Sequence, residues 1–507
     1  MSDKRIQSAL ISVFYKDGLA DIARLLNELG IKIYSTGGTY DFINGLGIKA
    51  EKVEDLTTYP SILGGRVKTL HPSVFGGILA RRENKEDLEQ LSKYKIPEID
   101  LVIVDLYPFE ETLKSTSDED EIIEKIDIGG ISLIRAAAKN YNDVLIVSGR
   151  NQYNGLISLL KDKKGVTSFA DRRLYAAMAF QASSYYDTAI FNYFNREAAI
   201  PAFREGIDET YPLRYGENPH QKGIFYGDID VIFKKLHGKE ISYNNLLDLD
   251  AALNIIDEFA LPTYVIIKHN NACGVATRTN TLDAWKDALA CDPLSAYGGV
   301  IVTNRPVDDA TAEEINKLFF EIIIAPGYSE NALEFLKQKK NRIILQRNDF
   351  VKRGYNFRAL LNGVLWQQTD NSTESADDMK PVTKREPTKE ELEDMVFANI
   401  IVKHSKSNAI VLAKNSQLYA SGIGQTSRVD ALKQAIEKAR TFGFDLSGAV
   451  MASDAYFPFP DSVELAHKAG ISAVVQPGGS VRDQESVDYC SKNGVAMVFT
   501  GIRHFKH

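Results

Sequence analysis

Two adjacent side chains with the chemistry of proton transfer stand near the middle of the chain. Lys268 and His269 end an apolar, strand-like run and lead into a polar loop, in VIIKHNNACG (265–274). A histidine accepts protons near neutral pH, and an adjacent lysine stabilises negative charge or protonates a leaving group. Because α/β folds place reactive groups where strands run into loops, the pair is a candidate catalytic centre. The alternative is a histidine with a structural role.

A glycine-rich turn near the N-terminus has the composition of a phosphate site. STGGT (35–39) follows a strand-like run and opens a helix-like one, a setting in which backbone N–H groups and the helix dipole bind oxyanions. Gly37 and Gly38 allow a phosphate to approach closely, and the hydroxyls of Ser35 and Thr39 can donate to it. The alternative is an ordinary glycine turn with Thr39 as N-cap. The nucleotide-binding pattern G-x-x-x-x-G-K-[ST] is absent.

A run of cations follows in GGRVKTLHP (64–72). Arg66, Lys68, Thr69 and His71 lie within a few positions of one another, without the acidic residues that usually accompany exposed lysines. The run predicts either an anion-binding pocket or a solvated basic face.

Other segments combine a charge with a hydroxyl, an aromatic ring or a helix start. Asp127 precedes a helix-like run, where N-capping is the alternative to chemistry. Arg135 and Lys139 fall four apart on that helix, a spacing at which like charges repel unless an anion is near. The remaining candidate segments are LRYGENPHQ with Arg214 and Tyr215, GIGQTSRVDAL with Ser427 and Arg428, the aromatic SDAYFPFPD, and the cation-rich C-terminus TGIRHFKH.

Alternating strand-like and helical segments must position these residues. Up to about residue 150, apolar runs such as SALISVF and DLVIVDLYPF alternate with helix-like stretches, which predicts a parallel, Rossmann-like α/β sheet. Residues 150–200 are helical and aromatic, and we interpret them as a connector. Two further α/β units follow, 201–368 and 396–507. The stretch 369–395 that separates them is polar and predicts an exposed linker.

Length and composition exclude several classes of protein. The 507 residues suggest about three domains, and a net charge of −8 argues against a non-specific nucleic-acid binder. No apolar run is long enough to span a membrane, and no signal-peptide core is present. Three cysteines are too few for a disulfide framework or a four-thiolate zinc site, and the zinc-deaminase signature is missing. We expect a cytoplasmic, reduced, multidomain protein.

Together and in this order, the motifs resemble one family: the bifunctional purine biosynthesis protein that is both formyltransferase of 5-aminoimidazole-4-carboxamide ribonucleotide (AICAR) and inosine monophosphate (IMP) cyclohydrolase. STGGT, GGRVKTLHP, LYPF, DIGG and RAAAKN are similar to its cyclohydrolase half. LRYGENPHQ, IIKHNNACG, DPLSAYGG, IIAPGY, SNAIVLA, GQTSR, SDAYFPFPD and TGIRHF are similar to its transferase half. The resemblance spans essentially the whole chain. It implies a methylglyoxal-synthase-like domain over 1–149 and a transferase half of two cytidine-deaminase-like α/β units.

The resemblance also implies the chemistry. The amine of AICAR attacks the formyl carbon of the co-substrate 10-formyltetrahydrofolate. The carboxamide nitrogen of the formylated product then attacks the formyl group and loses water, which closes the purine ring of IMP. No metal is required for either reaction. The family acts as a homodimer, and we expect neither nucleic acid nor a membrane as a partner.

Site residues follow from their positions in the matching motifs. His269 would assist removal of the amine proton, and Lys268 would stabilise charge or deliver a proton to the leaving folate nitrogen. The cyclohydrolase set is Lys68, Tyr107, Asp127 and Lys139. The residues matched to nucleotide, phosphate or folate binding are Ser12, Lys16, Ser35, Gly37, Thr39, Arg66, Thr69, Arg214, Tyr215, Gly298, Glu321, Asn408, Arg428, Tyr456, Arg503 and His507.

Several residues depart from the family pattern. Ala272 replaces a proline after Lys-His-Asn-Asn, which implies a less rigid loop, and Asp105 stands where relatives often have asparagine at a base-binding contact. Tyr297 replaces a common phenylalanine and adds a hydroxyl that needs a partner if it is buried. Glu321 stands where some relatives have aspartate. None of these changes removes a proposed catalytic group.

Two other functions remain open. One is an enzyme that keeps a single activity and uses its other half as scaffold. The other is a non-catalytic nucleotide sensor, which would need neither the Lys268-His269 pair nor Lys68 and Lys139.

Overall fold

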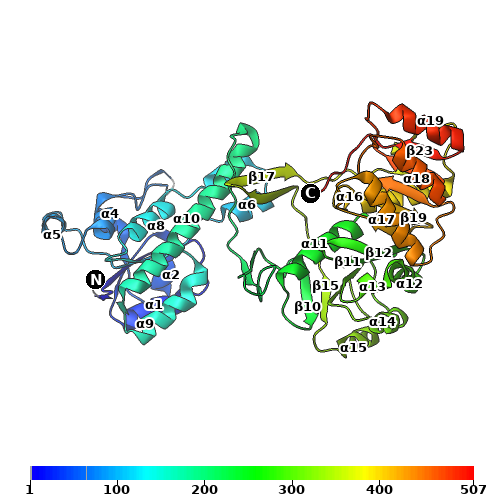
Figure 1. Ribbon diagram of the computed structural model, residues 1–507. Coiled ribbons are helices and arrows are strands. Elements are labelled where there is room, and N and C mark those ends of the chain that lie inside the picture. The colour runs from blue at the N-terminus through cyan, green and yellow to red at the C-terminus, as the bar shows by residue number, and fades with distance from the viewer. Residues whose placement is uncertain (1–2, 64–65) are drawn as a thin grey trace. The chain divides into compact units, whose positions relative to one another are not determined.

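The computed structural model describes residues 3–63 and 66–507 and divides into two compact units. Unit 1 runs to Asp208 and unit 2 begins at Glu209. Each unit has its own sheet and its own hydrophobic core. Figure 1 labels the elements of both units.

The main sheet of unit 1 has five parallel strands in the order β4-β3-β2-β5-β6. Because strands are added first on one side of β2 and then on the other, the order reverses between β2 and β5. Sheets of this kind bind ligands beyond the carboxyl ends of their strands, at the point of reversal. The strands are β2 (Ser8–Ser12), β3 (Lys32–Ser35), β4 (Glu51–Lys52), β5 (Leu101–Val104) and β6 (Leu145–Val147), with a separate pair β1 (Lys4–Arg5) and β7 (Val166–Thr167).

Helices cover both faces of this sheet. Side chains of α1, α2 and α9 share a core with one face, and those of α3, α4, α8 and α10 share a core with the other. Alternate strand residues enter the two cores because successive side chains of a strand point to opposite faces. The helices are α1 (Leu19–Glu28), α2 (Gly37–Gly45), α3 (Val53–Thr57), α4 (Pro72–Leu79), α5 (Lys85–Lys93), α6 (Phe109–Ser115), α7 (Glu119–Glu124), α8 (Gly129–Lys139), α9 (Tyr153–Asp162) and α10 (Phe169–Ala198).

The long helix α10 lies within unit 1. It starts at a capping box, in which Ser168 Oγ accepts the N–H of Asp171 at 3.2 Å while the Asp171 carboxylate accepts the N–H of Ser168 at 2.8 Å. The helix then packs along α8 and β6, and Ala176 and Ala179 are buried in the same core as α8. The stretch expected to be a connector therefore also supports the sheet of unit 1.

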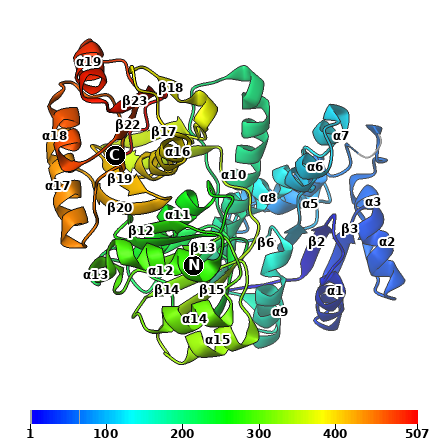
Figure 2. The same ribbon diagram turned by 90° about the vertical axis from the view of Figure 1, so that its right-hand side faces the viewer.

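Unit 2 is built on one twelve-stranded mixed sheet (Figure 2). Its order is β10-β15-β14-β13-β11-β12-β20-β19-β21-β22-β23-β18, so that β12 and β20 pair at its centre. The strands are β10 (Phe233–His237), β11 (Thr263–Lys268), β12 (Asn271–Thr277), β13 (Val300–Thr303), β14 (Ile322–Ala325), β15 (Ile343–Arg347), β18 (Lys380–Pro381), β19 (Ile410–Lys414), β20 (Gln417–Gly422), β21 (Val450–Ser453), β22 (Ala473–Gln476) and β23 (Ala496–Phe499).

The two halves of this sheet repeat one topology. Repeat 1 (233–347) and repeat 2 (380–499) each run from an edge strand through a helix into an antiparallel hairpin, and then through three more strands joined by helices. In both, the first of those three strands is antiparallel to the first strand of the hairpin, and the next two strands are parallel to the first of the three. The edge strand then pairs antiparallel with the last of the three. The two α/β units expected on either side of the polar stretch thus share one sheet and one fold.

Three helical layers complete unit 2. On one face, α11 (Tyr243–Ile256) and α16 (Lys389–Lys403) form a common core with both repeats. The other face is covered by a separate set of helices in each repeat. These are α12 (Thr281–Cys291), α13 (Pro293–Ala296), α14 (Asp309–Asn316) and α15 (Glu330–Lys337), and then α17 (Arg428–Thr441), α18 (Asp461–Ala469) and α19 (Asp483–Asn493).

The polar stretch 369–395 is more ordered and more buried than an exposed linker. It contains β18 and the first turns of α16, and Glu374 is only 3% exposed. Ahead of it lies a separate hairpin, and another opens unit 2. These are β16 (Tyr355–Leu360) with β17 (Gly363–Gln368), and β8 (Thr210–Pro212) with β9 (Ile224–Tyr226). In the described part of the chain, we find no helix with the length and hydrophobicity of a membrane span.

Candidate functional site

The loop after β2 and the loop after β5 meet where the strand order of unit 1 reverses. Asp105, directly after β5, accepts the backbone N–H of Phe14 and, at 3.1 Å, that of Tyr15. Burial raises the pKa of Asp105, and these hydrogen bonds and the charge of Lys16 oppose that rise. The carboxylate that stands at an expected base-binding position is therefore engaged in joining the two loops.

Four of the predicted residues form one electrostatic cluster at this edge. Asp127 is 8% exposed, and burial raises its pKa, while the Gly130 N–H and the charge of Lys68 act in the opposite direction. Burial and the Asp127 charge raise the pKa of Tyr107, so its phenol stays protonated. Burial lowers the pKa of Lys16, and Lys68 adds to that effect. The structure thus brings together two cations, a phenol and a buried carboxylate.

Asp127 also stabilises the backbone around it. Its Oδ1 accepts the N–H of Gly130, in the first turn of α8, at 2.6 Å, while Ile128 holds the N-cap position itself. A Cβ at position 130 would lie 2.5 Å from Asp127 Oδ2, so only glycine fits beside this carboxylate. The backbone N–H of Tyr107 acts on the same carboxylate.

The hydroxyls expected to hold a phosphate on STGGT bind the protein instead. Ser35 is fully buried and donates to the carbonyl of Ile11 at 2.8 Å. Thr39, 3% exposed, donates to the carbonyl of Val13 at 2.9 Å and accepts the N–H of that residue. Thr36, not Thr39, is the N-cap of α2. Both hydroxyls bind backbone carbonyls and so hold the shape of the loop. A phosphate at this loop would therefore be bound by backbone N–H groups.

The start of α2 suits that role. Gly37 has φ +43°, and a Cβ on Gly37 or on Gly38 would meet no other atom within 4 Å. The first N–H groups of a helix have no acceptor within the helix, so they are available to an anion. Ser12, at the end of β2, shares a 3.1 Å hydrogen bond with Thr36 and adds a hydroxyl beside the loop.

The residues of the cationic run GGRVKTLHP make different contacts. Gly64 and Gly65 lie outside the described residues. Arg66 forms an ion pair with Glu124, and the Nδ1 atom of His71 accepts the N–H of Ser73, which caps α4. In this run, Thr69 is buried beside the start of α8, where a Cβ on Gly129 would lie 3.2 Å from its hydroxyl.

Lys139 is not brought to the Asp127 cluster within the chain. Lys139 is the exposed last residue of α8, and Asp127 precedes the first. Ten residues of helix rise by about 15 Å, which puts Lys139 at the amino-end side of the parallel sheet. Arg135, between them, donates to Ser183 Oγ at 3.1 Å, so packing on α10 explains its spacing from Lys139 without an anion.

In unit 2, the strand registers gather the predicted residues at one edge of the sheet. β11 ends at Lys268, beside the start of β13, and β12 leaves from the same turn. Since β12 is antiparallel to β20 and β20 to β19, the end of β20 and the start of β19 also lie at this edge. We call it the Lys268 edge. Its predicted residues are Lys268, His269, Gly298, Glu321, Asn408, Arg428 and Tyr456.

The ammonium of Lys268 is fixed by two carbonyl groups. It donates to Tyr297 O at 2.8 Å and to Gly298 O at 3.0 Å. An ammonium has three N–H donors, so one is left for a substrate. Gly298 has φ +69°, and a Cβ there would lie 3.1 Å from the Lys268 nitrogen. The Tyr297 side chain is 62% exposed, so its additional hydroxyl needs no protein partner.

His269 is exposed at the tip of the β11–β12 turn, with φ +50°. The side-chain amide of Asn271 donates to the His269 carbonyl at 2.9 Å. Ala272, in the place of the family's proline, lies in β12 and is 5% exposed. The turn is therefore held by hydrogen bonds and by the strand in the absence of the proline.

Repeat 2 contributes a buried ion pair to this edge. Arg428 follows the N-cap of α17, Ser427, and its guanidinium donates to Ser453 Oγ at 3.0 Å and to Asp454 Oδ1 at 2.8 Å. Asp454 is 1% exposed. It was not predicted, because the motif SDAYFPFPD was interpreted only through its aromatic residues, although an aspartate at a strand end was visible.

Asn408 and the C-terminal tail lie beside this ion pair. The Asn408 amide donates to the Gln425 carbonyl at 3.0 Å. The His504 N–H donates to Asp454 O at 3.1 Å, and its imidazole lies between Asp370 (2.7 Å) and Glu374 (2.9 Å). The tail is therefore bound to the unit and not frayed. This brings its exposed residues Arg503 and His507 toward the Lys268 edge.

Three other residues predicted to contact the substrates are bound to protein groups. Glu321 forms an ion pair with Lys239 at 2.5 Å, which reduces its freedom to reach a ligand. Arg214 donates to the hydroxyl of Tyr215 at 2.7 Å, and their loop is joined to α11 through Asn244. Among the described residues, no hydrogen bond or ion pair joins Arg214 or Tyr215 to Lys268.

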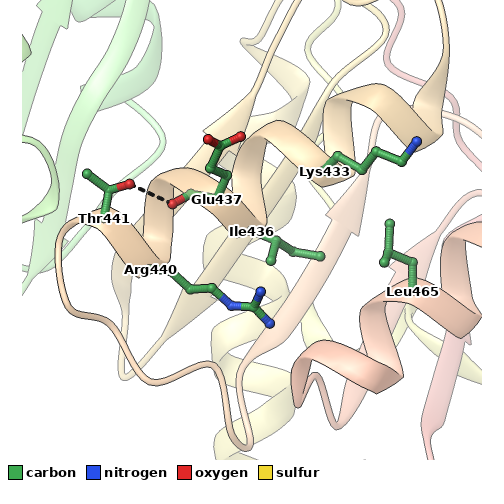
Figure 3. A pocket seen from close by; sticks show the side chains of 6 residues that line it. All are labelled: Lys433, Ile436, Glu437, Arg440, Thr441 and Leu465. Carbon is green, nitrogen blue, oxygen red and sulfur yellow. Dashed lines mark hydrogen bonds between the residues drawn. The ribbon is translucent and has the colours of Figure 1, made fainter.

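One hollow of the surface is lined by none of the predicted residues. It is formed between α17 and α18 by Ile436, Arg440, Leu465 and their neighbours (Figure 3). Among the described residues, no group of three or more His, Cys, Asp or Glu side chains is arranged to hold a metal ion.

Each of the two α/β units gathers cations and a carboxylate or an imidazole at one edge of its sheet, an arrangement typical of a two-domain enzyme. Residues 18–132 match the MGS-like domain, and residues 137–438 match the family described as AICARFT/IMPCHase bienzyme. The chain belongs to this bienzyme family.

Curated relatives match over the full length. Proteins named bifunctional purine biosynthesis protein PurH are 62% identical in Bacteroides thetaiotaomicron (99% of each chain), 48% in Acetivibrio thermocellus (99% of this chain, all of the relative) and 47% in Aquifex aeolicus (98% and all). A solved structure titled "Crystal structure of ForH" is 35% identical over 37% of this chain and 97% of that one, with a TM-score of 0.34.

Proposed function

We propose that the two activities of this bienzyme are divided between the two sheet edges. The enzyme transfers a formyl group from 10-formyltetrahydrofolate to AICAR and then closes the ring of the formylated product to give IMP, the last two steps of purine biosynthesis. Formyl transfer belongs to the Lys268 edge of unit 2, and ring closure belongs to the carboxyl edge of the sheet in unit 1. The single observation that carries this division is the fixed ammonium of Lys268 beside exposed His269.

Formyl transfer needs a proton acceptor and a donor on opposite sides of the reacting carbon. The amine of AICAR attacks the formyl carbon, and His269 takes the proton that the nitrogen loses. The third N–H of Lys268 stabilises the oxyanion that forms and provides a proton for the folate nitrogen as the C–N bond to it breaks. The products are formylated AICAR and tetrahydrofolate, so protons and bonds balance. Fixed donors act best where charge develops in the transition state.

The anionic nucleotide requires cations near this pair. Arg428 is held by Asp454, so it offers only its remaining N–H groups. Arg503 and His507, on the bound tail, supply exposed cationic or polar groups. We assign the remaining contacts with nucleotide or folate to Arg214, Tyr215, Gly298, Glu321, Asn408 and Tyr456.

Ring closure requires alignment more than acid strength, because both reacting groups belong to one molecule. The carboxamide nitrogen attacks the formyl carbon and loses one proton to the Asp127 carboxylate, and the formamido nitrogen loses a second proton as the ring C=N bond forms. Lys68 and the protonated phenol of Tyr107 stabilise the former formyl oxygen, which takes up these two protons and leaves as water. The phosphate is held by the first N–H groups of α2, including that of Gly37, with Lys16, Ser12, Arg66 and Thr69 around it. Ser35 and Thr39 shape the loop.

The remaining proposals concern organisation. We assign the cyclohydrolase to 1–149, supported by α10 of the same unit, and the transferase to 201–368 and 396–507 together with the stretch 369–395, which belongs to the fold of unit 2. We also propose that the enzyme acts in the cytoplasm as a homodimer, and that nucleic acid and membranes play no part.

Assays that follow tetrahydrofolate and IMP separately test this division. In His269→Ala, we expect formyl transfer to fall by at least about 10²-fold, the usual scale for loss of a general base, with AICAR binding kept. Cyclisation of purified formylated AICAR should remain at the wild-type rate. Transfer within a few-fold of wild type would remove His269 from the mechanism, and a wild-type chain that performs only one reaction would support the single-activity alternative.

A further inference from the structure

The turn that carries His269 rests on a carboxylate that the sequence analysis did not single out. The backbone N–H of Asn270 donates to Asp248 Oδ1 at 2.6 Å, and the N–H of His269 acts on the same carboxylate. Asp248 is a half-buried residue of α11. The turn at the end of β11 is thus tied to the helix that covers this face of the sheet.

The conformation of the turn explains why it needs such a tie. His269 and Asn270 have φ values of +50° and +64°, in the left-handed region that residues other than glycine seldom adopt. Successive N–H groups in turns of this kind converge on one point and attract an anion. The Asp248 carboxylate occupies that point. It therefore holds the backbone from which the His269 imidazole projects.

Repeat 2 contains the same arrangement without the histidine. Asn415 and Ser416 form the β19–β20 turn with φ values of +53° and +49°, and their N–H groups donate to Asp394 at 2.8 and 2.6 Å. Asp248 and Asp394 each lie six residues after the N-cap of their helix, α11 or α16.

The lysine before each turn donates to a backbone carbonyl in the same way. Lys414 donates to the carbonyl of Ser447 at 2.7 Å, next to Gly448 with φ +73°, as Lys268 does next to Gly298. This second frame lies at the opposite edge of the sheet. It holds Asn415 where the first frame holds His269, so it has the scaffold without the proton acceptor.

We propose that Asp248 is a positioning residue for formyl transfer, which it serves by fixing the backbone of His269 so that the imidazole faces the amine of the nucleotide. The proposal rests on the role assigned to His269 above. Asp394 makes the same bonds in a turn that has no part in the reaction, so it supplies a matched control within the same chain.

The test compares the two aspartates in the full-length enzyme. Asp248→Ala should lower kcat for formyl transfer by about 10- to 100-fold, the scale of a small misplacement of a reacting group, with KM for AICAR within about two-fold of wild type. Asp248→Asn keeps one acceptor oxygen and should recover part of the rate. Asp394→Ala should leave the transfer rate within about three-fold of wild type. Cyclisation in unit 1 and the thermal unfolding midpoint, measured on every variant, report the amount of folded enzyme.

A double variant separates positioning from general destabilisation. If Asp248 acts through His269, then Asp248→Ala combined with His269→Ala transfers no more slowly than His269→Ala alone. An additional loss in the double variant, or equal losses in Asp248→Ala and Asp394→Ala, would overturn the proposal. If the alanine variants do not fold, Asp248→Asn and Asp394→Asn give the same comparison. Normal transfer in His269→Ala would instead overturn the catalytic assignment itself, whatever the Asp248 variants do.

Discussion

Several polar side chains at the two edges already bind the protein itself, and this determines what each can still do for a substrate. The Ser35 and Thr39 hydroxyls are buried and bonded to backbone carbonyls. Lys268 retains one free N–H after two bonds, and Arg428 is largely committed to Asp454. The Asp127 carboxylate already accepts the N–H of Gly130 and is acted on by that of Tyr107. Residue types alone could not distinguish these states, because the partners come from distant parts of the chain.

Lys68 and Lys139 provide a test at the scale of single residues. Both match the cyclohydrolase pattern, but the charge of Lys68 acts on Asp127, whereas Lys139 lies at the far end of α8 from it. Lys68→Met should lower cyclisation turnover by about 10²-fold, because a group that stabilises developing charge is lost. Lys139→Met should change turnover by less than about three-fold. Steady-state kinetics on purified formylated AICAR, with formyl transfer as control, decide the matter. An equal loss in Lys139→Met would mean that this lysine reaches the site from a second copy of the chain.

At the scale of elements, the sequence predicts where helices start and strands end. It does not predict which distant residues bind at those ends. The strand before STGGT, the helix after it and the α17 N-cap at Ser427 all follow from local patterns of apolar residues and capping side chains. The prediction of an exposed linker over 369–395 was wrong, because Glu374 is buried and pairs with His504, more than a hundred residues away. Composition does not reveal such a pairing.

The start of α2 yields a prediction at this scale. Gly38 has room for a Cβ and no positive φ, so Gly38→Ala should fold normally and slightly favour the helix. If a phosphate approaches this backbone closely, the added methyl group will raise KM for formylated AICAR by at least about ten-fold with little change in kcat. Gly45→Ala, at the other end of the same helix and equally free of neighbours, is the control. Unchanged KM in Gly38→Ala would place the phosphate elsewhere.

At the scale of the molecule, unit 2 depends on bonds between its repeats. Glu258, just beyond α11, pairs with Lys403 at 2.9 Å and with His404, both near the end of α16. Arg278 of repeat 1 donates to the Asn415 carbonyl in the turn of repeat 2 at 2.7 Å. The sequence indicated two α/β units with similar patterns of strands and helices. It could not indicate that they share one sheet, because the central β12–β20 pairing has no local signature.

The Glu258 pairing predicts a dependence of stability on pH. Burial raises the pKa of Glu258, but hydrogen bonds from His404, Lys403 and Thr373 outweigh it and lower the pKa from 4.5 to about 2. Burial lowers the pKa of His404, so its imidazole is neutral near pH 7 and binds Glu258 as a hydrogen-bond donor. The pairing therefore contributes fully above about pH 4.5, and its contribution is lost as the pH falls toward 2. Urea unfolding of unit 2 should show wild type more stable than Glu258→Gln at pH 7, with the difference shrinking between pH 4.5 and pH 3. Glu334→Gln, a change at an exposed pair, should show no comparable trend. A difference that is the same at pH 7 and pH 3 would contradict the prediction.

The two copies of the lysine–turn–aspartate frame are exposed to unequal selection. Both must keep the left-handed turn, the supporting carboxylate and the adjacent glycine, since the sheet is built on them at each edge. Under the proposed mechanism, only the side chain at position 269 also serves a reaction. Position 415 can then accept any residue that tolerates the turn, while its counterpart must be a histidine. A chain that arose by doubling one ancestral half would retain the architecture of both copies and the chemistry of one.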